Sequence, residues 1–123
     1  MVALIEFDVP GALRRVGGDR ELLGRIIDFV AEDSPEFVRR MEIALKSGEY
    51  GEVERAAHSL KGLVSNLHCR AVQDKALEIE GLAHVQDKSS IAAAIATLSE
   101  LTDQMMLKID ELRQSLEAEA RAS

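Results

Sequence analysis

The sequence predicts an all-α fold, an up-and-down four-helix bundle with a short extra N-terminal helix. Three observations support this class. Hydrophobic residues make up 46% of the chain and are mostly good helix formers, only two residues are proline, and the apolar residues recur at helical spacing in segments joined by short connections. Such connections favour antiparallel neighbours. We expect a single domain over 1–123, structured over about 8–117.

The N-terminal part of the chain carries two helix-start signals. Asp8 lies two residues before Pro10, which predicts a small leading helix over 11–16 that ends at Gly17. Asp19 is then the expected N-cap of a long amphipathic segment.

That long segment, over 20–47, is apolar at helical spacing throughout and ends before Gly48. It contains another start signal, because Ser34 can act as an N-cap and Pro35 suits the first helical position. The sequence therefore allows either one helix kinked at Pro35 or two helices.

Three more helices are predicted, from about Glu52 to Leu67, from about Arg70 to His84, and from near Ser89 or Ser90 onward. In the last helix the apolar positions are separated alternately by four and three residues, as in a helix packed nearly parallel to its neighbours: Ile91, Ile95, Leu98, Thr102, Met105, Ile109, Leu112 and Leu116. Beyond Leu116 the only apolar residues are alanines, so we expect 118–123 to be a frayed tail.

Composition argues against several function classes. A formal net charge of −7 with only three phenylalanines and one tyrosine disfavours nucleic-acid binding. The single cysteine, Cys69, cannot form an internal disulfide, and no apolar stretch approaches the roughly 20 residues of a membrane span. We therefore expect a cytoplasmic protein, or the cytoplasmic domain of a membrane-bound sensor, with no membrane contact by this segment.

One histidine does not fit the apolar core. On a helical wheel of the segment 52–67, with about 100° per residue, the apolar residues cluster in one direction and His58 lies about 160° away from it. A histidine among alanines and leucines is usually a core residue, whereas this one faces outward. The same outward side carries four further residues: Glu54, Lys61, Gly62 and Ser65.

Gly62 and Lys61 suggest what the outward histidine does. A glycine inside a helix costs about 1 kcal/mol relative to alanine, a cost that is best tolerated where something must come close to the backbone. The three residues therefore predict an exposed imidazole nucleophile with open space and a cation beside it. If the incoming group is a phosphoryl, Lys61 is the nearest side chain able to offset its negative charge.

The segment His58-Ser59-Leu60-Lys61-Gly62, preceded by Ala56-Ala57, resembles the signature of the histidine-containing phosphotransfer (HPt) domains of multistep phosphorelays. The chain is similar to this family at further positions: Phe7-Asp8, Val16-Gly17-Gly18-Asp19, Phe29, Pro35, Ala44-Leu45, Gly48, Asn66-Leu67 and Ile79-Glu80. One departure is His68-Cys69, where the family usually has glycine followed by a small residue. This departure concerns the geometry of a loop. The hybrid sensor kinase type of HPt domain is the expected one.

The resemblance implies an activity and the residues that carry it out. His58 would accept a phosphoryl group from a receiver-domain aspartate and pass it to another receiver, as a phosphocarrier rather than a stand-alone enzyme. Lys61 would stabilise the phosphoryl group, and Gly62 would leave steric clearance for it. Glu80 stands where members often carry a Gln or Glu that hydrogen-bonds the imidazole, and on the wheel it lies at a helix–helix edge.

The expected partners are response-regulator receiver domains and, in a hybrid kinase, a sensor kinase in the same polypeptide. The docking face is expected to comprise Glu54, Arg55 and Ser65, close to His58. The sequence has no Walker-type loop, no other glycine-rich nucleotide cradle and no acidic metal cluster. We therefore expect a monomer that binds neither ATP nor metal, with Mg²⁺ supplied by the partner receiver domain.

Two other functions remain open: a non-catalytic helical-bundle docking domain, and the phosphotransfer domain of a chemotaxis-type histidine kinase. A zinc site at His68, Cys69 and His84 is disfavoured because these residues lack ligand spacing and a fourth partner. A dimeric coiled coil through 91–116 is also disfavoured, because the other apolar stripes need this helix as their own partner.

Overall fold

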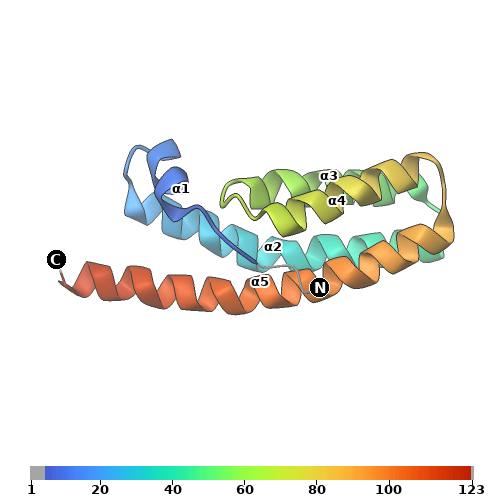
Figure 1. Ribbon diagram of the computed structural model, residues 1–123. Helices are drawn as coiled ribbons and strands as arrows, with labels where there is room; N and C mark the ends of the chain where they lie inside the picture. The colour runs from blue at the N-terminus through green and yellow to red at the C-terminus, as the bar shows by residue number, and fades with distance from the viewer. Residues whose placement is uncertain (1–4, 123) are drawn as a thin grey trace.

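The computed structural model describes residues 5–122, which form five α-helices and no strand. The helices are α1 (Val9–Arg15), α2 (Arg20–Lys46), α3 (Tyr50–Ser65), α4 (Arg70–His84) and α5 (Lys88–Ala122). Both α2 and α4 pack against α3 and α5, and α1 packs on α2. Figure 1 shows α3 and α4 over the C-terminal half of α2 and the N-terminal half of α5. The predicted up-and-down four-helix bundle with a short N-terminal helix is confirmed.

The core consists of the apolar stripes that the sequence predicts. The buried residues of α3 are Val53, Ala56, Ala57, Leu60 and Val64, and those of α4 are Val72, Ala76, Ile79 and Ala83. In α5 the seam is buried as far as Ile109, whereas Leu112 and Leu116 are only half-buried. The seam of α5 therefore packs against α2 and α4 of the same chain.

The segment 20–47 forms one helix, α2, which decides between the two alternatives that the sequence allows. Ser34 is buried in the interior of this helix, so the alternative in which it caps a second helix does not hold. Pro35 cannot donate a backbone hydrogen bond to the Ala31 carbonyl. The helix continues nevertheless, because Ala31 and Val38 on either side are buried in the core.

The helix-start signals at Asp8 and Asp19 act as predicted. Asp8 Oδ1 accepts a hydrogen bond of 2.9 Å from the Gly11 amide, and Asp19 Oδ1 accepts one of 3.0 Å from the Leu22 amide. The leading helix begins at Val9, two residues before the predicted start, because the first helical turn includes the proline.

The C-terminal tail differs from the expectation. Residues 117–122 continue α5 as helix, whereas 118–123 were expected to fray, and Ser123 lies outside the described residues. Alanine is the best helix former, and this tail alternates alanine with charged residues. Arg20 and Glu119 also form an ion pair that joins the last turns of α5 to the start of α2.

The turn after α3 shows how the chain accommodates His68-Cys69. His68 has a backbone φ of 56°, in the left-handed region where glycine is favoured. The Cys69 amide closes the turn by donating a hydrogen bond of 3.4 Å to the Val64 carbonyl. The HPt family usually has glycine at this position. The positive φ of His68 gives the physical reason, because glycine adopts this conformation without a steric cost.

Replacing His68 with glycine should therefore raise the free energy of unfolding by about 1 kcal/mol, because it removes the steric cost of a side chain at positive φ. Gln86, with φ of 57° after α4, should respond in the same way. Asn66 has φ of −59°, so Asn66→Gly is the control and should lower stability. Urea denaturation measures all three, and a loss of stability in His68→Gly would contradict this explanation.

The Cys69 thiol is fully buried at the start of α4. Burial raises its pKa, although a hydrogen bond with the Val72 backbone acts in the opposite direction. Because the thiolate is the reactive form, we expect the folded protein to react with a thiol reagent at least about tenfold more slowly than the unfolded chain. The measurement is the labelling rate with and without denaturant. Equal rates would show that the thiol is accessible.

Over residues 5–122, no helix combines the length and the apolar character needed to cross a bilayer.

Candidate functional site

The middle of α3 presents His58 to solvent. Its side chain is 72% exposed, whereas Ala57 and Leu60 on either side of it are fully buried. The apolar residues of α3 fix this orientation, because burying their stripe against α2 and α4 turns the opposite face outward. The outward position predicted for His58 is confirmed.

One carboxylate oxygen on α4 joins the histidine to the neighbouring lysine. Glu80 Oε1 lies 3.2 Å from His58 Nδ1 and 2.9 Å from Lys61 Nζ. The Glu80 side chain is only 17% exposed, so water screens this charge less than it screens a surface carboxylate. The structure thus brings together the three titratable residues on which the sequence hypothesis depends.

The contact with Glu80 decides how the imidazole presents its nitrogens. An ionised carboxylate can only accept hydrogen bonds, so His58 Nδ1 must be the donor. In a neutral imidazole with a proton on Nδ1, the other nitrogen, Nε2, carries a free lone pair. A neutral imidazole that donates from Nδ1 to Glu80 thus presents Nε2 as a nucleophile.

Open space lies one turn after the histidine, at Gly62. Among the described residues, no heavy atom beyond the local backbone comes within 4 Å of the place that a Cβ would occupy there. The Ser65 hydroxyl donates a hydrogen bond of 2.6 Å to the Gly62 carbonyl, so its side chain folds back against the helix. Gly62 and the folded-back side chain of Ser65 therefore leave room on this side of His58.

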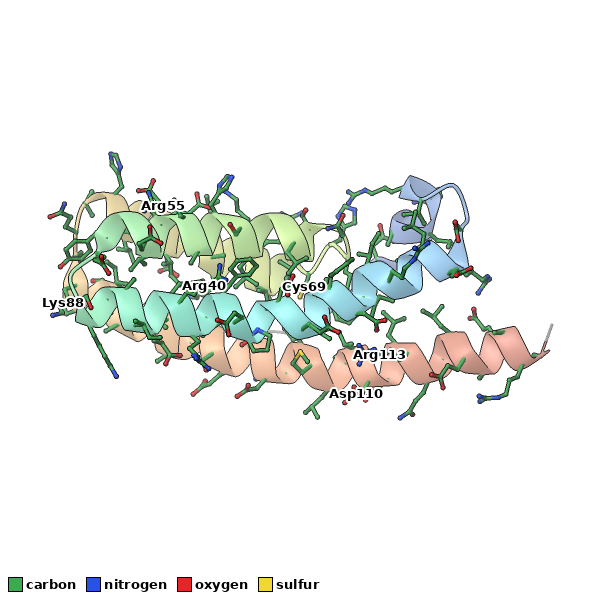
Figure 2. All side chains as sticks on the ribbon, turned by 180° about the vertical axis from the view of Figure 1, so that it is seen from behind. Arg40, Arg55, Cys69, Lys88, Asp110 and Arg113 are labelled. Carbon is green, nitrogen blue, oxygen red and sulfur yellow. The ribbon has the colours of Figure 1, made fainter. Side chains whose placement is uncertain are left out.

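A shallow hollow flanks His58 on the other side, towards the start of α3. It is lined by Gly51, Glu54, Arg55, Ser59 and Glu80 as well as the histidine itself. Figure 2 shows Arg55 on the outer side of α3, where it pairs with Glu52. The three residues of the predicted docking face, Glu54, Arg55 and Ser65, therefore lie on α3 on both sides of His58.

The residues considered for zinc are not brought together. His68 and Cys69 precede α4, and His84 is its last residue. A helix of 15 residues separates them by roughly 20 Å. In the part of the chain that the structure describes, no group of three or more His, Cys, Asp or Glu is arranged to hold a metal ion.

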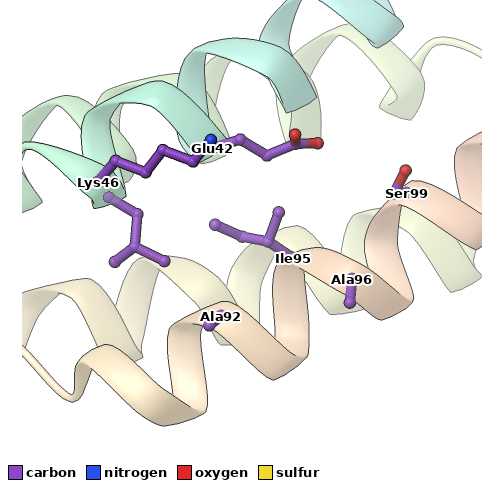
Figure 3. Close-up of a pocket in the computed structure, with 7 residues that line it drawn as sticks. Glu42, Lys46, Ala92, Ile95, Ala96 and Ser99 are labelled. Atoms are coloured by element: carbon purple, nitrogen blue, oxygen red, sulfur yellow. The ribbon is translucent and has the colours of Figure 1, made fainter.

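A groove between α2 and α5 carries none of the predicted site residues (Figure 3). Glu42, Leu45 and Lys46 line it from α2, and Ala92, Ile95, Ala96 and Ser99 line it from α5. Two of the residues that line it from α5, Ala92 and Ala96, have short side chains.

Sequence reasoning missed one polar contact at this site. Arg15, in the last turn of α1, donates a hydrogen bond of 3.0 Å from Nη1 to the Ser65 carbonyl. No local pattern signals such a contact, because it joins residues far apart in the chain and depends on how α1 packs.

The fold and the site agree with a known class of protein. The Hpt domain family matches residues 25–122, and the chain belongs to this family. It is therefore a histidine phosphotransfer module of a phosphorelay, a class whose partners are receiver domains. A comparison with curated proteins gave no significant match.

A solved structure is similar over nearly the whole chain. It is the crystal structure of histidine-containing phosphotransfer protein B (HptB) from Pseudomonas aeruginosa PAO1, with a TM-score of 0.82 and 20% sequence identity. The match covers 92% of this chain and 98% of that one. At this level of identity the similarity establishes the shared fold.

Proposed function

We propose that His58 accepts a phosphoryl group from the aspartyl phosphate of one receiver domain and passes it to the aspartate of another. The observation that carries this proposal is the contact between His58 Nδ1 and Glu80, in a side chain that is 72% exposed. In the neutral ring that donates from Nδ1 to Glu80, Nε2 carries no proton and faces a partner. No lid or loop has to move for a phosphoryl group to reach it.

The transfer follows from this protonation state. The Nε2 lone pair forms the nitrogen–phosphorus bond while the bond between phosphorus and the aspartyl oxygen breaks, and the aspartate leaves as a carboxylate. The ring keeps its proton on Nδ1 and becomes positively charged, and the Glu80 carboxylate beside Nδ1 offsets that charge. Transfer to the next receiver reverses these steps.

Lys61 and the receiver share the task of neutralising the phosphoryl oxygens. Lys61 Nζ and His58 Nδ1 both contact Glu80 Oε1, so the ammonium group lies close to the imidazole. A small movement of the Lys61 side chain brings its ammonium group to a phosphoryl group on Nε2. In this proposal Mg²⁺ is held by the receiver domain and neutralises the remaining charge.

The test is incubation with a phosphorylated receiver domain and Mg²⁺, followed by the stability of the label. Phosphate on histidine is lost in acid and retained in alkali. Absence of any label would favour a docking domain without transfer. Label that comes only from an ATP-dependent kinase, and never from a receiver, would favour the chemotaxis-type alternative.

Lys61→Ala should slow transfer about tenfold, which corresponds to about 1.4 kcal/mol of transition-state stabilisation. Lys75 on α4 is a matched control, because its side chain is similarly exposed and pairs with Glu78. Lys75→Ala should leave the rate unchanged. Measured transfer rates that are equal for the wild type and Lys61→Ala would remove the role proposed for Lys61.

A further inference from the structure

The short helix α1 reaches the end of the helix that carries His58. The Asp8 amide donates a hydrogen bond of 3.0 Å to the Leu67 carbonyl, and Arg15 Nη1 donates one of 3.0 Å to the Ser65 carbonyl. Ser65 is the last residue of α3, and its carbonyl also accepts a hydrogen bond of 3.1 Å from the His68 amide, whereas Leu67 lies in the turn that follows. The two contacts hold both ends of α1 near the C-terminal end of α3.

The contact of Arg15 brings a guanidinium to the C-terminal end of α3, two turns along the helix from the proposed phosphoacceptor. Ser65 lies two turns after His58 and about 20° from it around the helix, which is a distance of about 10 Å. The Ser65 side chain points back to Gly62 through its 2.6 Å hydrogen bond. Arg15 therefore stands at the end of a line of residues formed by His58, Gly62 and Ser65.

A partner that reaches His58 must also approach Arg15. A typical specific interface covers about 800 Å² of each protein, which as a circle has a radius of about 16 Å. An interface of this size centred on His58 includes Ser65 and the guanidinium bonded to its carbonyl.

The charge that α1 brings to this face is positive. Its last turn contains Arg14 and Arg15, and no acidic residue lies between Val9 and Arg15. The bond from Arg15 to a carbonyl is a bond to a neutral acceptor, so it does not cancel the charge of the guanidinium. The whole chain has a net charge of −7, and an acidic partner would otherwise be repelled at long range.

We propose that α1 is a docking element for the acidic rim of a receiver domain's phosphorylation site, and that Arg14 and Arg15 make this contact. This inference rests on the proposed function of His58. Positive charge added at the edge of this surface is a means for the chain to distinguish one receiver from another.

The experiment measures the Kd of receiver domains from the source organism for the wild type, Arg14→Ala, Arg15→Ala, the double variant and Arg15→Lys, at low and at high salt. Arg39→Ala is the control, because Arg39 is an exposed arginine on α2, which carries neither His58 nor the Arg15 contact. The double variant should bind about fivefold to tenfold more weakly at low salt, and the difference should shrink at high salt. Arg15→Lys keeps the charge and should bind nearly as the wild type does.

Equal affinities for the wild type and the double variant would overturn the inference. So would a loss in Arg15→Ala alone that is independent of salt, since that pattern indicates a purely structural role for its bond to Ser65. Binding is measured apart from transfer, so the two proposals can fail separately. Normal salt-dependent binding with no label on His58 would overturn the proposed function and leave the docking role of α1 supported.

Discussion

Replacing His58 with glutamine should abolish phosphoryl uptake from a phosphorylated receiver domain. Glutamine is polar and can still donate a hydrogen bond to Glu80, but its amide nitrogen has no nucleophilic lone pair. Because the His58 side chain is 72% exposed, the substitution should change the free energy of unfolding by less than about 0.5 kcal/mol. The measurement is the acid-labile, alkali-stable label, together with the thermal unfolding curve.

His84→Gln is the matched control for this prediction. His84 is also an exposed histidine, in the last turn of α4, and it is not part of the line of residues that contains His58. This variant should take up label as the wild type does. Label retained by His58→Gln, or lost from His84→Gln alone, would show that the phosphoacceptor has been assigned to the wrong residue.

Filling the space at Gly62 should make the protein more stable and less active at the same time. Nothing obstructs a Cβ there, so Gly62→Ala should raise the free energy of unfolding by about 0.5 to 1 kcal/mol through helix propensity. The added atoms lie one turn from His58, where the receiver approaches in the proposed function. Transfer should therefore slow in Gly62→Ala and fall by more than about tenfold in Gly62→Leu.

A substitution at Gly24 separates the effect on stability from the effect on the rate of transfer. This glycine lies inside α2, far from His58, and a Cβ there also meets open space among the described residues. Gly24→Ala should give a similar gain in stability with an unchanged rate of transfer, as measured by urea denaturation and by label uptake. An unchanged rate in Gly62→Leu would show that the receiver does not approach over this turn of α3.

Local periodicity was sufficient to predict the helices and the orientation of His58. The direction in which a helical side chain points follows from its sequence separation from the apolar residues of the same helix. The sequence of α3 therefore already determines which of its residues face outward. The same argument places Glu80 at the edge of α4 next to α3. Its approach to the imidazole was expected from the resemblance to the HPt family.

Contacts that depend on the packing of whole helices could not be predicted in this way. Lys61 and Glu80 were each singled out, but their ion pair depends on how α3 and α4 are aligned along their length. The continuity of α2 through Pro35 depends on the burial of Ala31 and Val38 in the core. This burial outweighs the loss of a backbone hydrogen bond at the proline. The bond from Arg15 to Ser65 depends on where the tertiary fold places α1.

The exposure of His58 has a consequence for the lifetime of the phosphorylated state. Enclosed active sites exclude water and so protect reactive intermediates from hydrolysis. A phosphoryl group on Nε2 of His58 would instead be surrounded by solvent, because most of this side chain is exposed. The rate of hydrolysis of the nitrogen–phosphorus bond would then limit how long the phosphorylated state lasts. Transfer would require an encounter with the next receiver before that bond is hydrolysed.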